Sequence, residues 1–150
     1  MKYHLAEVNI ARFRNAPEDP VNAGFMENLD RVNAAAEGQD GFIWRFTGAG
    51  NDAMDVQVFP DPNIAFNMSI WRDQASLMSF VYRNNVHSDI MRRRKEWFDK
   101  MDFHLVMWWI EEGRLPTAEE ARLRLSLLQE CGPTASAFTF AKMFPAPAAS

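Results

Sequence analysis

Hydrophobic residues repeat with two different periods along this chain. Residues 4–13 and 64–71 alternate between apolar and polar side chains, which is typical of strands with one buried face. Residues 42–47 follow a glycine and are rich in aromatic side chains, which predicts another strand. Residues 104–110 are apolar on both faces and predict a strand that is covered on both sides. A last, short strand is expected at residues 137–140.

Three other segments have the period of an α-helix. Asp19 and Pro20 are typical of a helix start, and apolar residues then recur every three or four positions up to Gly38. Asp73 is placed to cap a second helix. Thr117, followed by a glutamate three residues later, forms a capping box for a third helix, which a Gly-Pro pair ends.

The order of these elements predicts the fold class. Strand, helix, two strands, helix and strand follow one another, and a helix and a short strand are appended. This is the βαββαβ order of ferredoxin-like α+β domains, in which the helices cover one face of the sheet. At 150 residues, with no linker or internal repeat, residues 1–150 are expected to form one such domain.

The alternating strands also predict a polar sheet face. If the apolar positions of residues 4–13 and 64–71 face the helices, the other face is left uncovered. Arg45 joins that face if its aromatic neighbours pack against the helices. The remaining members are Glu7, Asn9, Asn67, Ser69 and Trp71. Such groups are suited to binding a small molecule, but they are also typical of a solvated face or of pairing with a second subunit.

Residues 86–98, VHSDIMRRRKEWF, carry the other candidate site. On a helix with 100° per residue, His87 and Arg94 fall on the apolar side together with Trp97, whereas the other two arginines face solvent. We therefore expect His87 and Arg94 to point inward, either into a pocket or into a core. Because an arginine does not lose its charge, Arg94 then requires an acidic side chain, a backbone carbonyl or an anionic ligand.

Composition narrows the class of function. The net charge of −4 argues against a nucleic-acid partner, and acidic residues directly follow the arginine run. The single cysteine, Cys131, leaves no intramolecular disulfide, and the chain has no apolar run long enough for a membrane span. We expect a cytoplasmic protein with no membrane partner. His4, His87 and His104 lack the close spacing of metal ligands, so no metal site is expected.

Seven motifs together resemble a known family. They are YHLAEVNIARF, GFIWRF, NMSIW, FVYRNNVHSDIMRRRKEWF, WWIEEG, PTAEEARLRL and AFTFAKMFPAP. The chain resembles a bacterial domain-of-unknown-function family (number three-two-nine-one) in the dimeric α+β-barrel superfamily, which includes antibiotic-biosynthesis monooxygenases. This resemblance implies a homodimer in which two ferredoxin-like subunits pair their open sheet faces. Its relatives include monooxygenases that need no cofactor, isomerases and haem-binding proteins, so the fold is a poor guide to chemistry.

Three hypotheses about function remain open. In the first, the protein is a monooxygenase-like or isomerase-like enzyme for an aromatic or polyketide-like compound, with His87 as acid/base and Arg94 on an anionic oxygen. Three tryptophans, Trp44, Trp71 and Trp97, would then form an apolar wall. In the second, it is a non-catalytic homodimeric module that binds a ligand or serves a structural role. In the third, it binds haem through His87. The sequence does not identify a cofactor.

Overall fold

The computed structural model describes residues 2–16, 18–46, 63–84, 92–99 and 104–147. Within them, five strands form one antiparallel sheet. The strands are β1 (Tyr3–Phe13), β2 (Phe42–Arg45), β3 (Ile64–Trp71), β4 (Phe98–Asp99) and β5 (Leu105–Glu111). The helices are α1 (Ala23–Glu37), α2 (Gln74–Arg83) and α4 (Ala118–Cys131), with short 3₁₀ turns η1 (Pro20–Asn22) and η2 (Arg94–Glu96).

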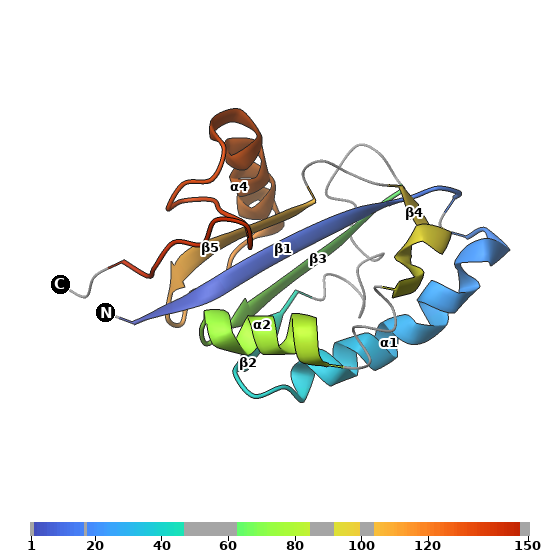
Figure 1. The fold of residues 1–150 in the computed structure, drawn as a ribbon, viewed down its shortest axis with the longest axis horizontal. Coiled ribbons are helices and arrows are strands. Elements are labelled where there is room, and N and C mark those ends of the chain that lie inside the picture. Colours follow the sequence, from blue (N-terminus) through green and yellow to red (C-terminus); the bar gives the residue numbers. More distant parts are fainter. Residues whose placement is uncertain (1, 17, 47–62, 85–91, 100–103, 148–150) are drawn as a thin grey trace.

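The strand order confirms the predicted ferredoxin-like α+β fold. The four main strands lie in the order β2-β3-β1-β5, with every neighbouring pair antiparallel. The two-residue strand β4 pairs with the end of β1, at Arg12 and Phe13. Figure 1 shows β1 running through the middle of the molecule, with β3 beside it. The short strand expected at residues 137–140 is replaced by isolated backbone bridges, one of which joins Phe138 to Met107 of β5.

The helices begin where the polar caps predict. The side chain of Asp73 accepts a hydrogen bond from the backbone N–H of Ser76 at 2.8 Å, and Thr117 accepts one from Glu120 at 3.1 Å. Asp19 caps the turn η1 instead, so that α1 itself begins four residues later. These caps satisfy backbone N–H groups that have no partner within the helix. None of the helices in the described part of the chain is long and apolar enough to cross a membrane.

The two faces of the sheet are covered by different helices, and the predicted assignment of the faces is wrong. Helices α1 and α2 pack on the face that carries Leu5 and Trp71, the face expected to be open. The face that carries Ala6, Val8 and Ile10 packs against α4. Alternation shows which residues share a face, but the direction of the strand crossovers decides which face the helices cover. We call these the α1–α2 face and the α4 face.

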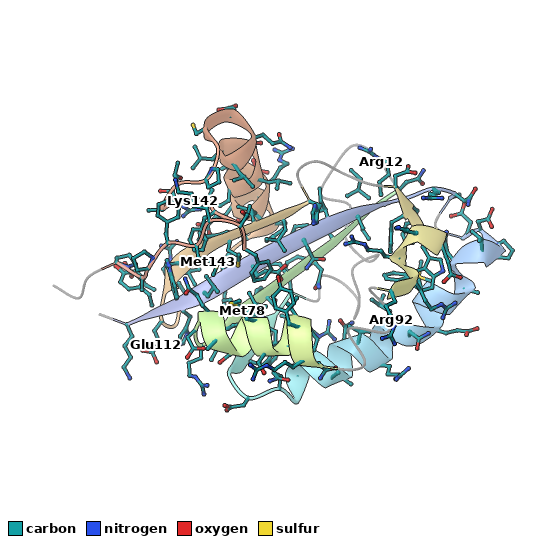
Figure 2. All side chains as sticks on the ribbon, viewed as in Figure 1. Arg12, Met78, Arg92, Glu112, Lys142 and Met143 are labelled. Atoms are coloured by element: carbon teal, nitrogen blue, oxygen red, sulfur yellow. The ribbon has the colours of Figure 1, made fainter. Side chains whose placement is uncertain are left out.

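The α1–α2 face contains two separate apolar clusters. One cluster surrounds Trp71 and Phe80 and includes side chains of the C-terminal segment, such as Met143. The other consists of Phe13, Ala65 and Trp97 with their neighbours near β4. In Figure 2, Met143 lies toward the end of the molecule that holds both termini, whereas Arg12 and Arg92 lie at the end that holds β4. The two clusters therefore lie at different ends of the same face.

Candidate functional site

Polar side chains occupy the part of the α1–α2 face between these two clusters. Arg45, Ser69 and Glu7 lie in one row across β2, β3 and β1, because Ser69 is in register with both of the others. Asn9 and Asn67 form the next row. We call these five residues the polar belt. Four of them were predicted to share a face, and Arg45 was predicted to join them if its aromatic neighbours packed against the helices. The strand register places all five on one face.

Glu7 is the buried member of the belt, with 5% of its surface exposed. Asn9 donates a hydrogen bond from Nδ2 to Oε1 of Glu7 at 2.8 Å, and the hydroxyl of Ser69 donates to Oε2 at 3.3 Å. Burial raises the pKa of Glu7 to about 7, although the two hydrogen bonds lower it. The carboxyl group is therefore half protonated near neutral pH, unlike an ordinary glutamate.

Ser69 is itself held by a buried tryptophan. The indole N–H of Trp71 donates to Oγ of Ser69 at 2.9 Å. The Trp71 ring is fixed in turn, because it stacks on Phe80 with 5.4 Å between centroids and meets Phe42 edge-on at 5.5 Å. Trp71 is 1% exposed, so it supports the site from within the core and offers no free ring face to a ligand.

The belt reaches solvent in its second row. Asn67 is exposed although it lies in the middle of β3, between β2 and β1 and on the face that carries two helices. Its partner Asn9 is half-buried, and Glu7 in the adjacent row is buried. The belt thus has an exposed amide and a buried carboxyl group in adjacent rows of the same face.

Arg45 closes the other end of the first row. Its side chain is 9% exposed, and its Nε lies 2.7 Å from Oε1 of Glu37, a half-exposed residue of α1. This ion pair supplies a counter-charge for the largely buried guanidinium group. The groups that bond Glu7 in the structure are instead neutral, namely Asn9 and Ser69.

The structure describes only the second part of the predicted site on residues 86–98. His87 lies outside the described residues. Arg94 is exposed, so the prediction that it points inward is wrong. The chain forms a 3₁₀ turn and then β4 here, so the angles of a continuous α-helix do not apply. Trp97 is buried as predicted, but the arginine over its ring is Arg93, at 4.8 Å from the centroid.

Two surface hollows lie elsewhere, around Arg72. One of about 450 Å³ lies beside Tyr3 and Ile43, and one of about 310 Å³ lies beside Asp40 and Ser76. The hydrogen bonds that Arg72 donates, first to Asp40 and then to Asp73, raise the pKa of Arg72 further above its ordinary range. Both hollows are open to solvent and lack a buried titratable group, so we assign the candidate site to the belt.

Among the described residues, no three His, Cys, Asp or Glu side chains are grouped as metal ligands.

Comparisons with solved structures support the fold alone. A protein of unknown function from Nitrosomonas europaea is 11% identical, with a TM-score of 0.52 over 77% of this chain and 96% of its own. A conserved protein from Methanosarcina mazei Go1 is 18% identical, with a TM-score of 0.52 over 71% and 90% of the two chains. A Pseudomonas aeruginosa protein is 12% identical, with a TM-score of 0.50 over 77% and 98%.

No curated protein matches the chain. A family model, however, matches nearly its whole length, from residue 4 to residue 150. The family resemblance predicted from the seven motifs is thereby confirmed. The chain belongs to the family described as a domain of unknown function, DUF3291.

Proposed function

We propose that this protein binds a small organic molecule over the polar belt and that Glu7 exchanges a proton with it. The observation that carries the proposal is the position of Glu7, a buried carboxyl group one register step from the exposed Asn67. Convergent polar groups beside apolar walls are typical of small-molecule sites. A titratable group with a shifted pKa in such a place is a candidate for proton transfer.

The chemistry of the belt suits general acid–base catalysis. With a pKa of about 7, Glu7 is present as both base and acid near neutral pH, which is the condition for efficient proton transfer in both directions. The amide N–H groups of Asn9 and Asn67 are suited to hold an oxygen atom of the ligand that gains negative charge. We infer a reaction in which a proton moves next to a carbonyl, enol or phenol group.

The finer assignment is a monooxygenase-like or isomerase-like enzyme for an aromatic or polyketide-like compound. It is supported by the partly buried aromatic side chains at the two ends of the belt, which include Phe42 at one end and Phe25 and Phe98 at the other. We retain His87 as a proposed second acid/base group. Arg94 was expected to hold an anionic oxygen of the ligand, but it is exposed. We therefore test Glu7 first and the role of Arg94 after it.

Acetophenone is a suitable probe because it combines an aromatic ring, a carbonyl oxygen and a methyl group that exchanges slowly with solvent. NMR in D₂O is expected to show that the protein accelerates deuteration of this methyl group at pH 7. Glu7→Gln keeps the size of the side chain but abolishes the acceleration. Asn67→Ala weakens acetophenone binding tenfold or more, whereas the control Gln129→Ala, which removes an exposed amide on α4, leaves it unchanged. Equal exchange rates in the wild type and Glu7→Gln would refute the proposal.

A second candidate is a non-catalytic homodimeric module. It is favoured by two exposed leucines near the fold's added helix, Leu115 at 57% and Leu123 at 60% exposure. Sedimentation of the wild type and Leu123→Glu tests it, because a dimer that uses this surface dissociates in the variant. Haem binding through His87 is tested by adding haemin, where the wild type but not His87→Ala is expected to give a shifted Soret band.

A further inference from the structure

Three buried side chains form a hydrogen-bond chain with a fixed direction. The indole N–H of Trp71 is a donor only, so Oγ of Ser69 must be its acceptor. The ionised carboxylate of Glu7 is an acceptor only, so the proton of Ser69 must point toward Oε2 of Glu7. Among these three groups, no other order of donors satisfies every partner while Glu7 is charged. Such chains polarise their members and strengthen each bond.

The same geometry makes the two oxygens of Glu7 different. Oε2 faces Ser69 and the buried Trp71, whereas Oε1 is bonded by Asn9, whose cross-strand partner Asn67 is exposed. Oε1 is therefore the oxygen that is bonded from the second row of the belt, the row that reaches solvent.

We propose that Ser69 and Trp71 are positioning residues for Glu7: the indole fixes the Ser69 hydroxyl on Oε2, which leaves Oε1 as the oxygen that exchanges a proton with the ligand. This inference rests on the proposed function, because it assigns roles to individual residues and atoms within the same site. Trp71 and Ser69 are 1% and 7% exposed, so neither is expected to touch the ligand. They act through the carboxyl group.

Few charged groups compete with this arrangement. In the described strands beside Glu7, the row contributes Arg45 from β2 and the uncharged Ser69 and Met107 from β3 and β5. Helix α1 contributes Glu37, which is paired with Arg45. The side chains of α2 that pack in the cluster beside Trp71 are apolar: Leu77, Phe80 and Val81. Burial is therefore the largest influence on how readily Glu7 ionises, followed by the hydrogen bond from Asn9 and then the one from Ser69.

The test measures the titration of Glu7 directly, by ¹³C NMR of its side-chain carboxyl carbon in the protein without ligand. In Ser69→Ala the carboxylate loses a donor, so the pKa of Glu7 is expected to rise above the wild-type value of about 7. Ser69→Thr keeps the hydroxyl and restores the wild-type titration. The matched control Ser79→Ala removes a half-buried hydroxyl from α2, which makes no bond to Glu7, and leaves the titration unchanged.

Trp71→Phe removes the indole donor and frees the Ser69 hydroxyl to turn, so the Glu7 titration moves in the same direction by a smaller amount. If this variant does not fold, Ser69→Ala with its threonine rescue decides the question alone. The pH profile of acetophenone exchange is expected to shift upward in parallel with the NMR titration in Ser69→Ala.

The outcomes separate this inference from the proposed function. If Glu7 titrates near 7 in the wild type and catalyses exchange, but Ser69→Ala titrates like the wild type, the positioning role is overturned and the function of Glu7 stands. If Glu7 titrates near its ordinary value and exchange is not accelerated in the wild type, the proposed function fails. A loss of stability in Ser69→Ala without a shifted titration would indicate a purely structural hydroxyl and would also overturn the inference.

Discussion

The two faces of the sheet are built differently. On the α4 face, apolar side chains from β1, β3 and β5 form one continuous cluster with Ala121, Leu125 and Leu128 of α4. On the α1–α2 face, the polar belt separates two apolar clusters. Burying a carboxyl group costs free energy that an apolar side chain would not cost. A face selected for stability alone would resemble the α4 face, so the belt is the part of the molecule where function is expected.

The largest expected effect is a loss of stability from a substitution on the apolar α4 face. Leu125 is 2% exposed between α4 and the sheet. Leu125→Ala leaves a cavity and is expected to lower the free energy of unfolding by about 2–5 kcal/mol, as measured by urea denaturation. The deuteration of acetophenone should be unchanged in the fraction of protein that remains folded. A parallel loss of binding in folded Leu125→Ala would show that the two faces are not separate in function.

The second effect is the pH dependence of stability that Glu7 in the polar belt is expected to produce. The pKa of Glu7 is raised by burial from 4.5 to about 7, so the folded state holds the proton more tightly than the unfolded state. This group therefore stabilises the fold most below pH 4.5, and the free energy of unfolding decreases between pH 4.5 and 7. The difference of about 2.5 pKa units corresponds to about 3 kcal/mol. Glu7→Gln should gain stability over the wild type by roughly this amount as pH rises through this interval.

Urea denaturation at pH 4.5 and at pH 8 measures that difference. Glu111→Gln, a change at a half-buried glutamate of β5, serves as the control and should show no such gain. A constant difference between Glu7→Gln and the wild type at both pH values would mean that the carboxyl group is not desolvated.

A smaller effect compares the helix caps of the two faces. Asp73 caps α2 and Thr117 caps α4, and removal of either cap is expected to cost about 1 kcal/mol. Partial burial raises the pKa of Asp73, but hydrogen bonds from Ser76 and Arg72 outweigh it and lower the pKa overall. The cap on α2 therefore loses its contribution as pH falls through this lowered pKa, whereas the neutral threonine does not titrate. Thermal denaturation of Asp73→Ala and Thr117→Ala at pH 7 and pH 3 distinguishes the two.

The smallest effect concerns two neighbouring arginines at the β4 end of the α1–α2 face. Arg93 lies over the ring of Trp97, and Arg94 is exposed. Arg93→Ala is expected to lower the free energy of unfolding by about 0.5–1 kcal/mol through the lost cation–π contact. Arg94→Ala should have no measurable effect on stability. If urea denaturation instead shows a larger loss of stability for Arg94→Ala than for Arg93→Ala, the result would support the inward orientation of Arg94 that the helical periodicity predicts.

Much of the fold could be predicted from local patterns. The alternation in β1 and β3 determined which side chains share a face, so Glu7, Asn9, Asn67 and Ser69 were brought together correctly. The caps at Asp73 and Thr117 placed two helix starts, because a side-chain oxygen three residues before a free N–H acts locally. The sequence also indicated Glu7 as a site residue, because it is a charged residue within a mainly apolar strand. It was predicted to bind the ligand and not to transfer a proton.

Only the tertiary structure decided which face the helices cover, which amide meets solvent and which arginine lies over Trp97. Ser69 and Asn67 have the same phase in β3, yet Ser69 is buried and Asn67 is exposed. That difference depends on where distant elements end above the sheet, and a strand's own sequence carries no record of it. The raised pKa of Glu7 has the same origin, because desolvation is produced by all the surrounding chain. The sequence by itself thus determined the members of the belt, and packing decided that one of them became a buried acid.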